Sequence, residues 1–319
     1  MKQSRLGQMR DSARMWVGLT LLGALCMIWA PVAWVLQRVL PAARGQRVGR
    51  SATTGFFRFY LRALVWMRAA RFDLSELDAL RDAGPQIVAP NHPSLLDAVL
   101  IISRLPQIGC VMKDELLKNI FLSAGARLAR YISNASVRDM IRRSVSDLQS
   151  GQSLLLFPEG TRSRCVPIGP CQRAVCVIAR AAKVPVQTVI IETDSPYLTK
   201  GWTLFHRPPF PIVYRVRLGR VFEVGDDDHA FLDELQQYFV DELGARARAV
   251  STAGASGRTG ERARDRTSDR AAAQDLRSPR GARPPSPAVE APPPGGRPVA
   301  HVIARTRRQA GEDGSGHLL

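Results

Sequence analysis

The sequence is short of acidic side chains, and the shortfall is uneven along its 319 residues. There are 28 Asp and Glu against 45 Lys and Arg, which gives a net charge of +17. Residues 1–50 carry eight basic side chains and one acidic one, and residues 251–319 carry twelve and seven. A nucleic-acid-binding domain built around one basic face does not fit this distribution. The two basic ends indicate either an anionic membrane surface or a nucleic-acid tail.

Cysteine is also scarce, and no CxxC pair is present. The five cysteines are Cys26, Cys110, Cys165, Cys171 and Cys176. An odd number of thiols, with no histidine at ligand spacing near Cys171 and Cys176, argues against a zinc site and a disulfide framework. We expect reduced thiols in a domain that faces the cytosol. No repeat period is found.

Charge is absent from the 23 residues between Arg14 and Arg38. A helix of this length could cross a hydrocarbon layer about 30 Å thick. Pro31 lies inside the run, and we expect it to kink or break the helix. Basic residues balance on both sides, which suits a re-entrant or monotopic hairpin with both ends at the cytoplasmic face. A cleaved signal peptide is the alternative, although the apolar run is longer than such peptides have.

The segment Gly55–Arg71 interleaves aromatic and basic side chains at helical spacing. Arg58 and Arg62 share one stripe beside an apolar stripe. The pattern predicts a helix that either lies in a lipid headgroup layer or packs on the domain. Residues 1–71 are therefore expected to form a membrane anchor with an interfacial segment.

Apolar runs and amphipathic helices alternate in the middle of the chain. Strands are predicted at residues 86–90, 154–157, 184–191 and 212–218. Helices are predicted at residues 98–102, 136–150, 173–183 and 229–243, with Ser136 as a cap and Asp139 at the capping-box position. The alternation predicts an α/β sheet with helices on its faces, over residues 72–250.

Residues 251–319 differ in composition from the rest. They contain eight Pro, nine Gly and twelve Arg, and no Phe, Tyr or Trp. A segment with so little apolar surface cannot offset its ordering entropy by burial, so a disordered tail is expected.

A histidine and a carboxylate follow the first predicted strand, in the segment NHPSLLD. At the end of a strand, neutral His92 could take a proton from an attacking hydroxyl. Asp97, about one helical turn further on, could fix the histidine tautomer and balance the imidazolium. Alone, the pair is also typical of a loop-capping His with an Asp at a helix start.

A second polar segment, FPEGTRSR, follows the strand predicted at residues 154–157. Gly160 would let backbone approach a ligand closely. Arg162 can grip a phosphate through its planar fork, and Thr161 can add a hydroxyl donor. The alternative is a structural turn held by a Glu–Arg pair. Taken together, a base in one loop and an anion clamp in another indicate an acyl- or phosphoryl-transfer site.

The two blocks resemble those of the membrane-associated glycerolipid acyltransferases of the lysophosphatidate acyltransferase type. NHPSLLD is similar to that family's NHx[S/T]xxD block, and FPEGTRSR to its phosphate-binding block. Lys113–Leu117 lies where the family has an intermediate block that begins with Lys, and Val184–Val186 resembles its fourth block. The resemblance covers about residues 85–220 and the apolar N-terminus.

The resemblance implies a fold and a set of roles. The fold would be a mixed α/β sheet flanked by helices. His92 would be the general base, Asp97 would orient it, and attack on a fatty thioester would be direct. Asn91 and Ser94 would shape the loop. The residues expected to bind the acceptor's phosphate end are Glu159, Gly160, Thr161 and Arg162, with Lys113 and Arg164 as further candidates.

The expected partners are membrane lipids, a lysophospholipid acceptor, and acyl-CoA or acyl-carrier protein as co-substrate, with no cofactor, metal or nucleic acid. The expected product is phosphatidic acid from 1-acylglycerol 3-phosphate, made at the cytoplasmic face of a bacterial inner membrane. Residues 165–174 do not follow the pattern that the family often has there, an Asp-Gly pair and then Lys and Gly before the next helix. The acceptor could therefore be another lipid or a pigment. A membrane-tethered polyanion-binding protein is the alternative from a different class.

Overall fold

The computed structural model describes residues 5–163, 167–203 and 205–245. Within these residues one sheet has the strand order β1-β7-β6-β2-β5-β3-β4. The strands are β1 (Ala70–Asp73), β2 (Ile87–Pro90), β3 (Gly109–Met112), β4 (Ile132–Ser133), β5 (Leu154–Leu155), β6 (Val186–Thr193) and β7 (Ile212–Phe222). Strands β2 to β6 are parallel, whereas β7 is antiparallel to β6 and parallel to β1. The predicted mixed α/β sheet is confirmed.

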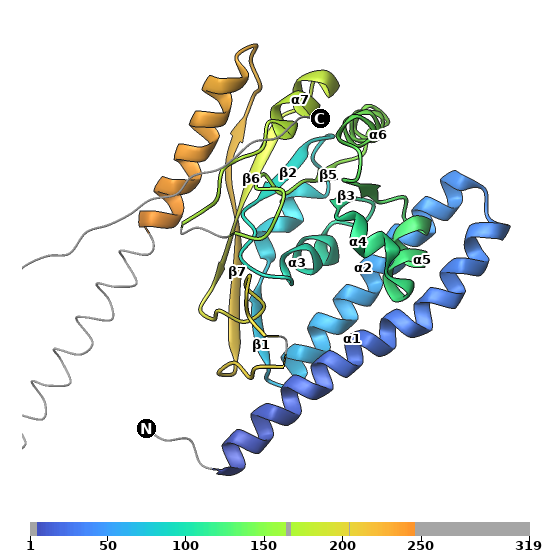
Figure 1. Cartoon of the computed structure of the whole chain (residues 1–319), viewed down its shortest axis with the longest axis vertical. Coiled ribbons are helices and arrows are strands. Elements are labelled where there is room, and N and C mark those ends of the chain that lie inside the picture. The colour runs from blue at the N-terminus through green and yellow to red at the C-terminus, as the bar shows by residue number, and fades with distance from the viewer. Residues whose placement is uncertain (1–4, 164–166, 204, 246–319) are drawn as a thin grey trace, which may run out of the picture. The chain divides into compact units, whose positions relative to one another are not determined.

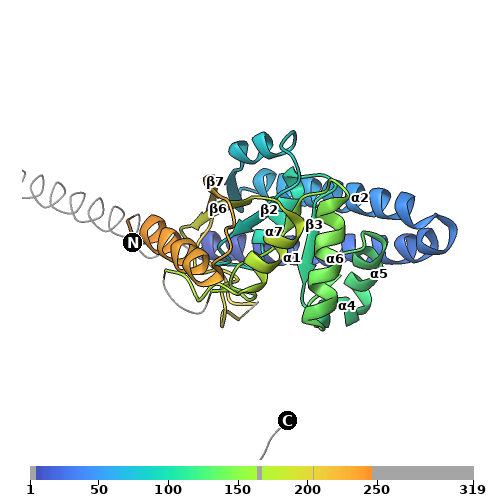
Figure 2. The same ribbon diagram turned by 90° about the horizontal axis from the view of Figure 1, so that it is seen from above.

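Helices cover both faces of this sheet (Figures 1 and 2). They are α1 (Arg5–Val39), α2 (Ala42–Trp66), α3 (Asp97–Arg104), α4 (Asp114–Lys118), α5 (Ile120–Leu128), α6 (Val137–Gln149), α7 (Ala174–Ala182), the 3₁₀ helix η1 (Ser75–Leu80) and a helix at residues 228–245. The helix predicted at residues 136–150 is confirmed as α6, and its cap is the predicted one, because Ser136 Oγ accepts from Asp139 N at 3.3 Å. The predicted tail, residues 251–319, lies outside the described residues.

Alternation along the strands divides the apolar side chains between two cores. Val88 of β2 belongs to the cluster formed with α2 and α3. Its neighbours Ile87 and Ala89 belong to the cluster formed with α6, α7 and the helix at residues 228–245. Because successive side chains of a strand point to opposite faces, a strand buried on both faces reads as a continuous apolar run. The short apolar segments were therefore correctly predicted to be buried strands.

Helix α1 corrects the expectation for Pro31. The expected break does not occur, since α1 continues through Pro31 to Val39. Contacts before and after the proline hold the helix against α5. The Trp29 ring lies so close to Gly125 that a Cβ on Gly125 would be 2.7 Å from its Nε1, and Gln37 Nε2 donates to Ala124 O at 2.7 Å. Tertiary packing thus compensates for the backbone hydrogen bond that proline removes.

Helix α2 returns alongside α1 and packs on the α/β domain (Figure 1). It begins earlier than predicted and ends at Trp66, so the prediction of helix up to Arg71 was wrong at that end. Arg68 has a positive φ of 56°, and the chain then enters β1. Thr54 Oγ1 and Arg58 Nε donate to the carbonyl oxygens of Ile102 and Ser103, at 3.0 and 2.6 Å. This face of α2 therefore follows the alternative of packing on the domain.

One buried cation joins α2 to four other segments. Arg50 is 1% exposed. Its Nε donates to Ala129 O at 3.0 Å and its Nη1 to Gln107 O at 2.9 Å, and Nη1 also contacts the side chain of Gln152. Its Nη2 pairs with Asp147 Oδ2 of α6 at 2.7 Å. A guanidinium with every side hydrogen-bonded can remain charged in the interior.

The close packing of α2 against the end of α5 depends on Gly49. A Cβ at this position would lie 2.6 Å from Ala129 N, which is backbone and cannot move aside easily. Only glycine therefore lets α2 come near enough to the end of α5 for the neighbouring Arg50 to reach its partners.

Replacing Arg50 with Met should destabilise the fold strongly. The variant keeps the volume but leaves the Asp147 carboxylate and two carbonyl oxygens without their donor, so we expect a loss of about 3–5 kcal/mol in the free energy of unfolding. Urea denaturation of the purified chain measures this. The matched control is Arg47→Met, an exposed residue of the same helix, and equal stability of the two variants would contradict the assignment.

Candidate active site

The polar loops predicted from the sequence lie at one edge of the sheet. Strands β2, β5, β3 and β6 are parallel, so their carboxyl ends share this edge. The loop after β2 carries His92 and the loop after β5 carries Glu159. Backbone and side-chain bonds join the two loops: Ser163 N donates to His92 O at 2.8 Å, and His92 N donates to Glu159 Oε1 at 3.3 Å. The structure therefore brings both predicted blocks together.

His92 and Asp97 form a hydrogen-bonded pair. His92 Nδ1 lies 2.8 Å from Asp97 Oδ2. A carboxylate oxygen can only accept, so the proton of this bond is on Nδ1 and Nε2 is the nitrogen that can act as a base. The imidazole also stacks on Phe157, with ring centroids 3.8 Å apart and an interplanar angle of 20°. Two independent contacts thus fix the plane of the ring.

Asp97 lies in the first turn of α3 and is fully buried. Ser94 donates to it twice, from its backbone N to Oδ2 at 2.7 Å and from its Oγ to Oδ1 at 2.9 Å. Burial raises the pKa of Asp97 above its ordinary value, while the bonds from His92 and Ser94 act in the opposite direction. A positive charge that forms on the imidazole would be stabilised by this carboxylate, which water does not screen.

Two further side chains support the pair, and one of them was missed from the sequence. Asn91 shapes the loop as predicted, because its amide both donates to Ile191 O and accepts from Ile191 N, at 2.9 and 2.7 Å. Tyr214 of β7 donates to Ser94 Oγ at 3.1 Å. Burial raises the pKa of Tyr214, so its hydroxyl stays a donor. No local pattern could have identified Tyr214, because this contact spans 120 residues.

Glu159 holds the loops together. Besides the bond from His92 N, its Oε1 accepts from Ser163 Oγ at 2.6 Å, and its Oε2 accepts from Gly169 N at 2.8 Å. The residue is 5% exposed. The carboxylate therefore satisfies three donors inside the protein, and its predicted contact with the acceptor stays a prediction.

The remaining residues of the second block sit in a tight turn. Gly160 has a φ of +64°, which glycine adopts without strain. Arg162 Nη1 donates to Leu198 O and to Thr199 O, both at 3.0 Å. Thr161 Oγ1 accepts from Lys200 Nζ at 3.3 Å. Among the residues that the structure describes, Arg162 bonds through Nη1, and its Nε and Nη2 carry three further protons that a ligand could accept.

The other two predicted phosphate ligands are less well defined by the structure. Lys113 is exposed and directly follows β3, so it belongs to the same sheet edge as the two loops. Arg164 lies outside the described residues. Binding of the acceptor by these two residues stays a prediction.

A third loop, residues 194–201 after β6, completes the edge and was missed from the sequence. Leu198 has a positive φ of 62°, and its carbonyl oxygen accepts from Leu95 N at 3.2 Å as well as from Arg162. One strained peptide thus ties the His92 loop to the Arg162 loop. The available signal was the Asp-Ser-Pro sequence at the end of a predicted strand, which is typical of a turn.

An apolar cavity of about 130 Å³ lies beside the His92 loop. Leu95 and Leu96 of that loop line it, as do Leu198 and Tyr214. The rest of the wall comes mainly from α1 and α2, with single residues from β1, α3, the loop after β6 and the start of β7; it includes Met15, Gly18, Leu22, Tyr60, Leu64 and Ile212. The catalytic loop thus lies between a polar turn and an apolar space.

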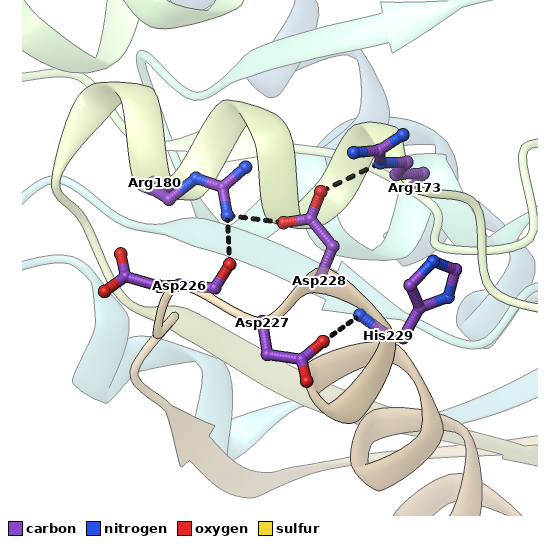
Figure 3. A pocket seen from close by; sticks show the side chains of 6 residues that line it. All are labelled: Arg173, Arg180, Asp226, Asp227, Asp228 and His229. Carbon is purple, nitrogen blue, oxygen red and sulfur yellow. Dashed lines mark hydrogen bonds and ion pairs between the residues drawn. The ribbon is translucent and has the colours of Figure 1, made fainter.

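A larger hollow, of about 510 Å³, lies between α7 and the helix at residues 228–245 (Figure 3). Asp228 pairs there with Arg173 at 2.8 Å and with Arg180 at 2.6 Å. The hydrogen bond from Arg173, and after it the one from Arg180, hold the pKa of Asp228 below its ordinary value. Asp227 Oδ1 caps the helix by accepting from His229 N at 2.8 Å. These ion pairs fasten two helices, and none of the lining residues belongs to the polar loops.

Among residues 5–163, 167–203 and 205–245, no group of three or more His, Cys, Asp or Glu side chains of the kind that holds a metal ion is found. The expectation that the chemistry needs no metal or cofactor stays a prediction. Cys26, Cys110, Cys171 and Cys176 are free thiols.

Known proteins give an independent comparison. The family model described as Acyltransferase matches residues 71–192. The 1-acyl-sn-glycerol-3-phosphate acyltransferase beta of Homo sapiens is 24% identical over 200 residues, which are 60% of this chain and 70% of that protein. A Caenorhabditis elegans protein named as the 1-acyl-sn-glycerol-3-phosphate acyltransferase acl-1 is 24% identical over 155 residues, which are 46% of this chain and 59% of that protein.

A solved structure shares the fold. The crystal structure of the 1-acyl-sn-glycerophosphate acyltransferase PlsC from Thermotoga maritima aligns with a TM-score of 0.58 at 16% identity, over 75% of this chain and 97% of that one. The family match begins at β1 and ends within β6, so it contains both polar loops. Residues 71–192 therefore form a domain of the Acyltransferase family, and the motifs and relatives of the chain are similar to those of the lysophosphatidate acyltransferases.

Proposed function

We propose that the chain is a membrane-bound O-acyltransferase that converts 1-acylglycerol 3-phosphate to phosphatidic acid, with acyl-CoA or acyl-carrier protein as the donor. The observation that carries this proposal is the His92 imidazole, bonded at 2.8 Å to the buried Asp97 carboxylate. A base held in this tautomer suits removal of a proton from an alcohol. Relatives named as 1-acyl-sn-glycerol-3-phosphate acyltransferases support the choice of acceptor.

The proposed reaction has two proton transfers and one acyl transfer. His92 Nε2 takes the proton of the acceptor hydroxyl as its oxygen attacks the thioester carbonyl carbon. Asp97 stabilises the imidazolium that results. The tetrahedral intermediate then collapses, its carbon–sulfur bond breaks, and the departing thiolate takes the proton from His92. The products are an ester and a free thiol, and His92 returns to its neutral form.

The apolar cavity supports a fatty substrate. Its lining is mostly apolar, with Arg14 and three tyrosines among the lining residues, and it touches the His92 loop at Leu95 and Leu96. Removing apolar surface from water is favourable by roughly 25 cal/mol per Å². A fatty chain that entered this cavity would leave its carbonyl end near His92. We therefore assign the cavity to part of an acyl chain.

The mode of membrane attachment follows from how α1 is held. The helix contains a candidate membrane span, Leu6–Val39, and only 6% of its apolar 18-residue stretch is buried. Near its start Trp16 stacks on Phe205, with centroids 5.2 Å apart, and near its end Gln37 bonds to α5. A helix fastened to the domain at both ends cannot cross a bilayer independently of it. The proposed arrangement is therefore an α1–α2 hairpin lying in the membrane interface.

The catalytic face is assigned to the cytosolic side, where thiols such as Cys110 and Cys176 remain reduced.

Removing the base tests the function directly. His92→Ala and Asp97→Asn should each lower kcat for transfer from acyl-CoA to lysophosphatidate by about 10²–10⁴-fold, because one lacks the base and the other lacks the charge that orients it. The measurement is phosphatidic acid formed by the purified chain, with folding checked by circular dichroism. His229→Ala, an exposed histidine outside the loops, serves as the control. Full activity of His92→Ala would refute the proposed base.

The anion clamp predicts a selective loss with a phosphorylated acceptor. Arg162→Ala should raise the KM for lysophosphatidate by about 10- to 100-fold, because a charge-assisted hydrogen bond is lost. The KM for a monoacylglycerol, which lacks the phosphate, should change much less. Arg138→Ala, exposed on α6, is the comparison variant. An unchanged KM for lysophosphatidate would remove Arg162 as the clamp.

The interfacial hairpin predicts where a single charge will matter. Ile28 of α1 and Val137 of α6 are 64% and 63% exposed, so Asp at either position should be tolerated by the fold. Ile28→Asp should lower the partition of the chain onto anionic vesicles about tenfold or more, because an apolar side chain is no longer buried in lipid. Vesicle flotation measures the partition. Equal flotation of the Ile28→Asp and Val137→Asp variants would contradict the arrangement.

A further inference from the structure

Lys200 lies in the loop after β6, outside the NHPSLLD and FPEGTRSR segments, and this loop holds it at the polar turn. Its Nζ donates to Thr161 Oγ1 at 3.3 Å. Thr161 and Arg162 are neighbours in the second block, and Arg162 bonds to Leu198 and Thr199, the two residues just before Lys200. Residues 198–200 of the loop after β6 are therefore hydrogen-bonded to Thr161 and Arg162 of the second block.

The backbone fixes the place of this lysine. Leu198 O accepts from both Leu95 N and Arg162 Nη1, and Leu198 and Gly201 have positive φ values of 62° and 90°. A left-handed residue two positions before the lysine and another directly after it give the loop a defined reversal. Lys200 therefore reaches Thr161 because of how the loop is built.

The chemistry of the three side chains suits one ligand. Thr161 Oγ1 accepts from the ammonium, so its own hydroxyl proton is available to be donated. Within the described part of the chain, Arg162 uses Nη1 on the carbonyl oxygens, and its Nε and Nη2 are further donors for a ligand. An ammonium, a hydroxyl and a guanidinium are the donors that recognise phosphate.

We propose that Lys200 is a third ligand of the acceptor's phosphate, beside Thr161 and Arg162, and that it makes the site selective for a phosphomonoester. The proposal rests on the proposed function. A phosphomonoester carries about −1.5 to −2 charge at pH 7, whereas a phosphodiester carries about −1 and a monoacylglycerol none. A second cation beside Arg162 therefore stabilises the bound phosphomonoester more than the phosphodiester or the monoacylglycerol.

The test compares acceptors that share an acyl chain and differ in the headgroup. The purified full chain is assayed in mixed micelles with lysophosphatidate and with monoacylglycerol, as Lys200→Gln, Lys200→Arg and wild type. Lys200→Gln should raise the KM for lysophosphatidate by about 10- to 100-fold, because one charge-assisted bond is lost. Lys200→Arg should keep it within about threefold, since the charge is retained. The rate with monoacylglycerol should be the same in all three.

Lys183→Gln is the matched control, because Lys183 is exposed at the end of α7, just before β6 begins at the opposite edge of the sheet. Lys200→Gln that keeps the wild-type KM for lysophosphatidate would overturn the proposal while leaving the proposed function intact.

Binding without turnover separates the two proposals. Titration calorimetry with glycerol 3-phosphate measures the affinity of the polar turn for a phosphomonoester. If wild type makes no phosphatidic acid, the proposed function fails. The Lys200 assignment is then decided by the calorimetry alone: it stands if Lys200→Gln weakens binding about tenfold relative to Lys183→Gln, and it falls if the two variants bind equally.

Discussion

A carboxylate with no exposure to water is the constraint on which the catalytic edge depends. Asp97 is fully buried, and an isolated charge in that position would be strongly destabilising. The fold supplies donors from three directions: His92, the backbone and hydroxyl of Ser94, and, behind Ser94, the hydroxyl of Tyr214. The same bonds that make burial tolerable also orient the imidazole. Stability and catalysis therefore require one geometry, because any movement of His92 away from Asp97 leaves a buried charge short of a donor.

Buried charges elsewhere join segments that are distant in sequence. Glu159 accepts from the His92 backbone, from Ser163 and from Gly169, and so it fixes the spacing between the two polar loops. Arg50 does the same for α2, the end of α5 and α6. The Glu159 carboxylate and the Arg50 guanidinium find all their hydrogen-bond partners only when several helices and loops are correctly placed. These bonds therefore favour the native packing over similar packings of the same elements. In the proposed function Glu159 would act through structure, by holding the His92 loop and the second polar loop together.

Local features of the sequence predicted one half of the site, and sheet order determined the other half. The His92–Asp97 pair and the FPEGTRSR turn each lie within one short segment after a strand, so their pairing in the sequence and their resemblance to known blocks could point to them. Tyr214 and the loop that carries Leu198 depend on β6 lying between β2 and β7, and no short pattern encodes that order. Helix α1 shows the same limit, since contacts with α5 override the local effect of Pro31.

The apolar cavity links the membrane hairpin to the chemistry in the proposed function. Residues of α1 and α2 form one wall, and the His92 loop and Leu198 form the other. Met15 and Gly18 of the cavity lie on the same stretch of α1 as Trp16, which is half exposed and stacks on Phe205. Because the helix that would contact lipid also lines the cavity, a fatty chain could pass from the interface towards His92 along apolar surface. The phosphate would remain at the polar turn on the other side of the base, so the two ends of an amphiphilic acceptor would be held by chemically opposite walls.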